Sequence, residues 1–543
     1  MKRLLCLLLM STLALHAQGK KKKKGGNNPE GPQVVNLGEA KLGPDIAGER
    51  VSDPGKQSDW PAVAAASDGS FYTAYVVWND KDADSIVVRR KDPGGKWEAP
   101  VTIEDGAWDH YAPAIVARGS GALAVWSGQA QSGFDLYAAE ISPNGKVTKP
   151  ERLTRAPMSD FNVRAASDSS GNVTVVWQSF RNGNADIYAR RLGGKSWGPE
   201  TRISTSDAND WEPSLALDKR GVAWISWDSY HTGNYDVYLR SFDGRKLGET
   251  VAVTTEPTAQ FHSSVAVDGE GRVWVAWDDG GQNWGKDFSA VSSAPGSRGL
   301  HWGRSLGIRV YANGRVQNPA ADLGAIMTGR MKRYAELPHL AFDGGGALWM
   351  VFRHWTDTRP NETYHFYATR LSGGSWTLPS KFSMSSGHNT QHASLTLNPS
   401  GALFAAYSSD GRSISNVPTS QSHSLHYNVY LSALPKGEGP PNAGLQDAAL
   451  PPPAAHPPAR PRHTMTAGGK TYHLLMGDAH RHTDIRGHNG VDGSVLDTYR
   501  YAIDAAQLDW LGTSDHNEVT GGKWPDGLRD YQWWTVQKTV DLM

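Results

Sequence analysis

An aromatic residue, usually tryptophan, recurs about every fifty residues at the end of an apolar strand-like segment, and this period constrains the fold more than any other feature. Each repeat has four short segments of strand-like text, and an Asp/Gly turn separates the first two. Seven repeats of four short strands predict a mainly β protein, a seven-bladed β-propeller. The repeated residues are Trp78, Trp126, Trp177, Trp227, Trp277, Phe352 and Tyr407.

The repeated polar residues of this propeller need no catalytic role. The Asp-x-x-Gly turns, such as Asp218 to Gly221, follow from turn chemistry alone. The Asp-x-Tyr pairs, such as Asp186 and Tyr188, recur with the period and are expected to be scaffold. We place the propeller at residues 32–435, with an insertion around 281–335 near its mouth. Residues 32–43 read as a fourth strand without a repeat before it, so we expect them to complete the last blade and leave no open edge.

The propeller resembles the secreted propellers that include sialidase-like and TolB-like repeats. The sialidase signature, Ser-x-Asp-x-Gly-x-x-Trp, is not met, because the turns here are one residue longer. The resemblance implies a binding module for a carbohydrate or protein ligand, and no glycosidase residue can be named.

The N-terminus has the pattern of a secretory signal peptide over residues 1–18, with Lys2 and Arg3 before an apolar run and cleavage near Ala17. The single cysteine, Cys6, lies inside it, so the mature chain has no disulfide. Residues 19–31 are a Lys/Gly/Asn-rich spacer. Lys plus Arg equals Asp plus Glu, 55 each, which argues against nucleic acid as a partner. No segment reaches the ~20 apolar residues of a membrane span. We expect a secreted or periplasmic protein, a monomer.

A Pro/Ala-rich stretch at 436–470 predicts a semi-rigid linker to a second domain at 471–543. There, an apolar strand runs into His480 and His482, which alternate with Asp478 on one side. An amphipathic helix and a second short strand then lead to Asp515 and His516. Two strands with a crossing helix predict a βαβ unit whose reactive groups gather at the carboxyl ends of the strands.

The segments "DAHRHT" and "SDHN" resemble the PHP (polymerase and histidinol phosphatase) family of metal-dependent phosphoesterases over residues 471–523. The resemblance implies a distorted (β/α)7 barrel and two or three Zn²⁺, Mn²⁺ or Fe²⁺ ions that assist hydrolysis. It assigns His480 and His482 to one metal and His488 and His516 to another. Asp478 and Asp515 would orient imidazoles as outer partners.

Only residues 517–543 follow His516, and two βα units cannot close such a barrel. The last helix is expected to leave an apolar face uncovered, formed by Trp534, Val540 and Leu542. We therefore predict that this chain holds the first part of a metal site and is inactive alone, as a fragment of a longer hydrolase. The alternative is a secreted propeller binding protein with a non-catalytic C-terminal remnant.

Overall fold

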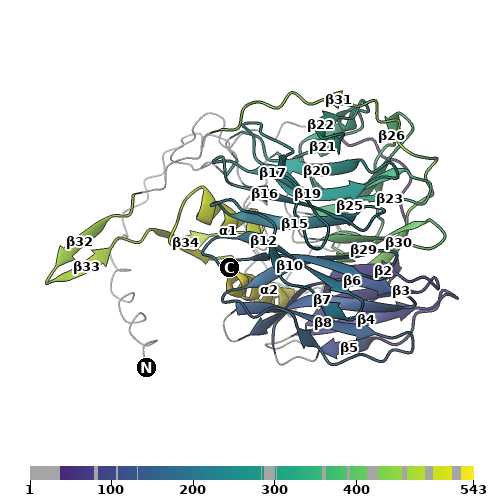
Figure 1. Cartoon of the computed structure of the whole chain (residues 1–543), viewed down its shortest axis with the longest axis horizontal. Coiled ribbons are helices and arrows are strands. Elements are labelled where there is room, and N and C mark those ends of the chain that lie inside the picture. Colours follow the sequence, from purple (N-terminus) through teal and green to yellow (C-terminus); the bar gives the residue numbers. More distant parts are fainter. Residues whose placement is uncertain are drawn as a thin grey trace, which may run out of the picture.

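The computed structural model contains a β-propeller with a smaller C-terminal segment against one end of it (Figure 1). It describes residues 37–78, 84–104, 108–130, 133–282, 284–285, 300, 303–357, 363–387, 392–412, 426–454, 461–483, 493–515 and 528–543. Within these residues, seven antiparallel sheets of four or five strands follow one another along the chain. The predicted seven-bladed propeller is confirmed.

Each blade begins with the strand nearest the central channel and continues outward. The first four blades are β2 (Ser58–Ala65), β3 (Phe71–Trp78), β4 (Asp84–Lys91) and β5 (Val101–Glu104); β6 (His110–Arg118), β7 (Gly121–Ala130), β8 (Gly133–Ile141) and β9 (Glu151–Arg152); β10 (Asp160–Ser167), β11 (Val173–Ser179), β12 (Asp186–Gly193), β13 (Ser196–Trp197) and β14 (Thr201–Arg202); and β15 (Asp210–Leu217), β16 (Ala223–Ser229), β17 (Asp236–Phe242) and β18 (Val251–Ala252).

The last three blades contain the deviations from the simple repeat. They are β19 (Gln260–Val267), β20 (Val273–Asp279), β21 (Ser305–Ala312), β22 (Arg315–Asn318) and β31 (Gln446–Asp447); β23 (Ala335–Phe342), β24 (Leu348–Asp357), β25 (Thr363–Ser372), β26 (Ser375–Trp376) and β27 (Ser380–Lys381); and β28 (Ala393–Leu397), β29 (Leu403–Ser409), β30 (Asn428–Ala433) and β1 (Glu49–Arg50). Two 3-10 helices, η1 (Leu323–Ala325) and η2 (Gly329–Lys332), precede β23.

The repeated tryptophan and tyrosine form one cross-strand pair. Trp177 on β11 lies directly opposite Tyr188 on β12, with stacked rings 6.0 Å apart. The same stacking joins Trp227 to Tyr238 at 6.1 Å. Asp186, two residues before Tyr188, accepts from Arg202 at 2.7 Å within the same blade. The predicted scaffold role of the Asp-x-Tyr pairs is confirmed, because aromatic cross-strand pairs stabilise a sheet.

The ring closes as predicted in principle, but through different residues. Strand β1, at residues 49–50, pairs with β30 and completes the seventh blade. Of the predicted closing segment, residues 32–36 lie outside the described residues. Gly43 instead donates to the carbonyl of Pro379 at 2.9 Å, on the sixth blade. The prediction of closure by residues 32–43 is therefore wrong in its register, since a two-residue edge strand has no sequence pattern of its own.

The predicted insertion around 281–335 is smaller than expected. Residues 305–318 form β21 and β22, which are regular strands of the fifth blade. Asn313 and Gly314 connect them with positive φ values of 53° and 75°, the conformation of a two-residue hairpin turn. The fifth blade thus keeps its own four strands, and the extra chain lies before β21 and after β22.

The predicted linker is attached to the propeller over its first half. Strand β31 adds to the outer edge of the fifth blade by pairing with β22. Asn442 donates to the carbonyl of Gly373 at 2.5 Å, and the hydroxyl of Thr255 donates to the carbonyl of Pro451 at 2.6 Å. The chain therefore runs from the seventh blade back across the sixth and fifth before it reaches the C-terminal segment.

The C-terminal segment contains an exposed hairpin, β32 (Thr464–Ala467) with β33 (Lys470–His473), and a parallel pair, β34 (Gly477–Arg481) with β35 (Trp510–Thr513). Helix α1 (Val495–Asp504) joins the parallel strands, so the predicted βαβ unit is confirmed. Figure 1 shows the hairpin standing away from the body, while α1 and α2 (Leu528–Leu542) lie against the end of the propeller. No helix among the described residues is long and apolar enough to cross a membrane.

The expectation that the last helix leaves its apolar face uncovered is wrong for two of its three residues. Trp534 and Leu542 are buried, Leu542 completely, in the core cluster of the first blades. Val540 remains 41% exposed. Apolar side chains of the propeller cover this part of the helix, a contact that the sequence did not predict.

Candidate functional site

The two histidines of the His-x-His pair lie together at the end of β34. Their Nε2 atoms are 3.1 Å apart, and His482 is buried. Asp515 follows the adjacent strand β35 and accepts from the backbone and hydroxyl of Thr483, at 2.6 and 2.9 Å. The structure thus brings together the carboxyl ends of both strands, as the βαβ prediction requires.

The 3.1 Å separation of the two Nε2 atoms is a hydrogen-bond distance, and it is also close to the separation of two nitrogens bound to one metal. Two nitrogens that each lie 2.0–2.1 Å from a tetrahedral zinc are separated by roughly 3.3 Å. His488 and His516 lie outside the described residues, and within the described residues no three His, Cys, Asp or Glu side chains form a metal-binding group. Asp478 accepts from the backbone N–H of His480 at 2.9 Å. The predicted orienting role of Asp478 and Asp515 toward imidazoles stays a prediction.

A second candidate site, at the mouth of the propeller, has no counterpart in the sequence analysis. Six of the seven inner strands carry a β-bulge at the same place, and each bulge holds a non-glycine residue with positive φ. Bulges of this kind re-aim a side chain, and strained backbone of this kind is concentrated at functional sites. The six residues are Trp60, Ala112, Asn162, Glu212, His262 and Leu337.

Helix α1 inserts a buried cation into this mouth. Arg500 is almost fully buried, donates to Asp228 on β16 and lies 3.9 Å from Glu212. Its guanidinium also lies 4.7 Å from the ring centre of Tyr235 and 5.3 Å from that of Trp211. Burial raises the pKa of Asp228 to about 7, and Arg500 opposes this rise. A carboxylate and an aromatic wall therefore hold the arginine, a strong combination away from water.

One turn earlier, Asp497 joins a second buried network. It accepts from Nε2 of His262 and from Arg304, both at 3.2 Å. Asp278 accepts from the same two residues, from Nδ1 of His262 at 2.9 Å and from Arg304 at 2.7 Å. Burial lowers the pKa of His262, but the carboxylates of Asp278, Glu212 and Asp497 outweigh it and hold this pKa well above the usual value. The histidine is therefore a cation between carboxylates.

The last turn of α1 presents a carboxylate to neutral donors. Asp504 accepts from Asn209 at 2.5 Å, from the indole N–H of Trp211 at 2.8 Å and from the hydroxyl of Tyr235 at 2.6 Å. Burial raises the pKa of Asp504 to about 6, although these hydrogen bonds favour its charged form. The polar face of α1 is thus as deeply buried as its apolar face.

Helix α2 fills the other half of the mouth in the same way. Lys538 is fully buried and donates to Asp84 at 2.6 Å and to the carbonyl of His110 at 3.0 Å. Its ammonium lies 4.2 Å from the ring centre of Trp60, a cation–π contact. Tyr531 donates to Asp59 at 3.1 Å. Both helices therefore close this end of the channel through cations that meet acids of the blades, Asp228 on β16 and Asp84 at the start of β4.

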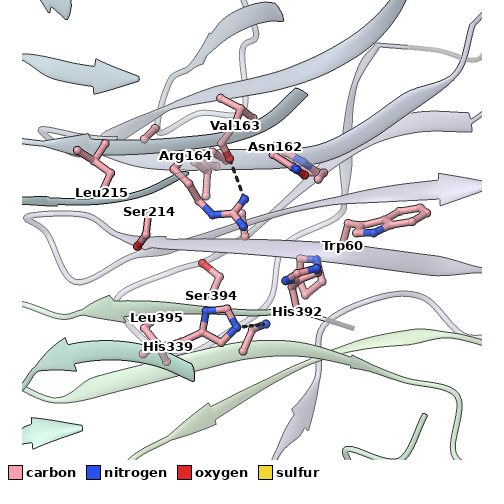
Figure 2. Close-up of a pocket in the computed structure, with 18 of the residues that line it drawn as sticks. Trp60, Asn162, Val163, Arg164, Ser214, Leu215, His339, His392, Ser394 and Leu395 are labelled. Carbon is pink, nitrogen blue, oxygen red and sulfur yellow. Dashed lines mark hydrogen bonds between the residues drawn. The ribbon is translucent and has the colours of Figure 1, made fainter. Parts of the chain in front are cut away.

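Deeper along the axis, a cavity of about 210 Å³ lies between the inner strands. Figure 2 shows Arg164 on one side of it and His339 and His392 on the other, with Ser214 and Ser394 between them. Trp60 and His392 also border a smaller cavity beneath α1 and α2. The cavity thus lies in the channel directly below the closed mouth.

No family model matches the chain, and no curated protein matches it. Similar solved structures include an ulvan lyase of polysaccharide lyase family PL25, 13% identical with a TM-score of 0.46, over 77% of this chain and 99% of that chain. A sialidase from Trypanosoma rangeli is 12% identical with a TM-score of 0.37, and the match covers 73% of this chain and 58% of the sialidase chain. An α-L-arabinanase from Penicillium chrysogenum is 12% identical with a TM-score of 0.36, and the match covers 73% of this chain and 98% of the arabinanase chain. All three likenesses have TM-scores below 0.5 and assign the chain no activity.

Proposed function

We propose that residues 471–543 form the opening βα units of a PHP-type metal-dependent phosphoesterase and that the propeller is its binding and docking module. The observation that carries the proposal is the 3.1 Å separation of the His480 and His482 Nε2 atoms at the end of a parallel βαβ unit. His480 and His482 would hold one divalent ion, Zn²⁺, Mn²⁺ or Fe²⁺. His488 and His516 are proposed for a second ion.

The chemistry that such ions supply is the activation of a water and the neutralisation of charge on a phosphoryl oxygen. The residues of this chain position the ligands. Asp478 fixes the backbone before His480, and Asp515 ties the end of β35 to Thr483, next to His482. Asp515 therefore connects the two strand ends, while the contact of Asp478 lies within β34.

Exposed apolar side chains on the βαβ unit support a larger sheet at this place. Leu474, Leu475 and Trp510 are 55%, 63% and 47% exposed. Parallel strands are found almost only in sheets covered on both faces. We therefore propose that further strands of the same fold cover these side chains in the complete enzyme.

The test is metal analysis of the full chain by mass spectrometry after equilibration with zinc or manganese and removal of free metal. We expect stoichiometric metal in the unchanged protein and its loss in the His480→Ala/His482→Ala double variant. His463→Ala is the matched control, since His463 is an exposed histidine before β32 and outside the βαβ unit. Metal that persists in the double variant, or no metal in the unchanged protein, would refute the site.

A second candidate function is favoured by the burial of Arg500 and Lys538 in the mouth. In that case, the C-terminal segment is a structural plug of a propeller that binds a carbohydrate or protein ligand. A chain that binds no metal but whose helices α1 and α2 stay docked would favour this alternative.

A further inference from the structure

The cavity in the middle of the propeller channel contains a positive charge without a negative partner. Arg164, on β10, donates to the carbonyl of Val163 at 3.1 Å, and no described carboxylate lies within ion-pair distance of it. Glu212 is the acid whose charge acts most on it, but Glu212 already lies 3.5 Å from His262 and 3.9 Å from Arg500. Arg164 is only partly exposed, and that exposure is toward the cavity. A charge that is partly removed from water is normally paired.

The cavity wall supplies hydroxyl donors around this charge. Ser214 accepts from the backbone of Val265 at 3.1 Å, and Ser394 accepts from the backbone of Val63 at 3.1 Å. Ser264 accepts in the same way from the next blade. Because each hydroxyl is an acceptor in these bonds, its hydrogen remains available to a molecule in the cavity.

Two histidines face the same space in their neutral form. His339 accepts from the backbone of Ala393 at Nε2, which leaves its hydrogen on Nδ1. Burial, with a contribution from Arg164, lowers the pKa of His339 to about 3 and that of His392 well below the usual value. Neutral imidazoles add donors without adding charge, so Arg164 is the one cation among the described residues of the cavity wall.

Among the described residues, no aspartate or glutamate lines the cavity, and the cavity is larger than a simple ion. A volume of about 210 Å³ compares with about 30 Å³ for one water in the liquid. The space suits a molecule of several non-hydrogen atoms that brings its own negative charge. Arginine is the side chain best shaped for a carboxylate or a phosphate, because its planar N–H groups can donate in pairs.

We propose that this channel cavity is a binding site for a small organic or inorganic oxyanion, a carboxylate or a phosphate, held by Arg164 and the surrounding hydroxyl and imidazole donors. The site is independent of the proposed metal site, because none of its residues belongs to the C-terminal segment. Its ligand replaces the missing counter-charge of Arg164.

The test is calorimetric titration of the full chain with succinate, with inorganic phosphate and with succinamide, the uncharged counterpart of succinate. We expect heat from an anion and none from succinamide. Arg164→Gln should weaken binding by about tenfold or more, the loss of one charge-assisted contact. Arg164→Lys should weaken it less, since it keeps the charge without the planar fork.

The control is Arg220→Gln, which removes the same charge from a side chain that is 78% exposed and paired with Asp218. Tighter binding of succinate than of phosphate would identify a carboxylate ligand, and the reverse order a phosphate. The proposal fails if neither anion binds at millimolar concentration, if succinamide binds equally well, or if Arg164→Gln and Arg220→Gln have the same effect. A thermal scan without ligand adds an independent readout: Arg164→Gln should raise the melting temperature, whereas a structural role for Arg164 would make it fall.

Discussion

Two arginines in the same channel differ in whether an acid pairs with them. Arg500, at the mouth, is placed against Asp228 and Glu212 and among aromatic rings. Arg164, below it, has no described carboxylate within ion-pair distance. At the mouth, the buried charges of the helices and the blades neutralise one another. In the cavity, no described carboxylate forms an ion pair with Arg164. The fully buried and paired Arg500 indicates a role in docking, and the partly exposed Arg164 without a paired acid indicates a role in binding.

The largest expected effect comes from breaking the pair at the mouth. Arg500→Gln leaves Asp228 buried without its partner and should destabilise the docked helices by about 3–5 kcal/mol. Proteolysis of the opened state reports this loss, and chymotrypsin should cleave within α1 at least about a hundredfold faster. Arg220→Gln should leave the cleavage rate unchanged. An unaltered rate in Arg500→Gln would show that the mouth and the cavity do not differ in the way described.

The second expected effect is a pH dependence of the docking free energy of the helices. The pKa of Asp504 is raised by burial to about 6, above its ordinary value, so the docked state binds more protons between about pH 4 and 6. Its contribution to docking is therefore complete at low pH and is lost as the pH rises through 6, with a slope of up to about 1.4 kcal/mol per unit.

Asp504→Asn should remove that part of the pH dependence, measured as the difference in docking free energy between the variant and the unchanged protein. The other buried groups of the mouth titrate in both proteins and cancel in the difference. A difference that stays flat from pH 4 to 7 would contradict the raised pKa of Asp504.

The smallest expected effect concerns the N-terminal cap of α1. Ser494 caps this helix by accepting from the backbone of Asp497 at 3.0 Å. Ser494→Ala should cost about 1 kcal/mol of docking free energy, the typical value of such a cap. Ser494→Asp should restore most of it, since aspartate is an equally good cap. A loss as large as that in Arg500→Gln would mean that helix formation, rather than charge pairing, dominates docking.

The repeated parts of the molecule could be predicted from the sequence, because their signal is periodic and local. The aromatic pair Trp177 and Tyr188, the Asp-x-x-Gly turns and the βαβ order each lie within one repeat or one short segment. Docking could not be predicted in the same way. His262 and Asp497 are 235 positions apart, and a polar stripe on α1 would be assigned to solvent unless its partner were known.

One local signal for the mouth was nevertheless available. The fourth and fifth repeats place an aspartate directly after the strand-ending tryptophan, as Asp228 and Asp278, where the second and third have Ser127 and Gln178. An acid at a buried position where other repeats have a neutral residue indicates that a cation pairs with it. The bulges carry no such signal, since their positions are occupied by residues as different as Trp60, Ala112 and Glu212.

The pairing of β31 with the fifth blade also determines how the mouth meets its two helices. The chain contacts the propeller as far as Pro451. Because the helices belong to the same chain as the propeller, they are presented to the mouth at an effective concentration of roughly millimolar. Any free molecule that competes for the mouth must overcome that local excess, whereas no described residue of the C-terminal segment lines the cavity around Arg164.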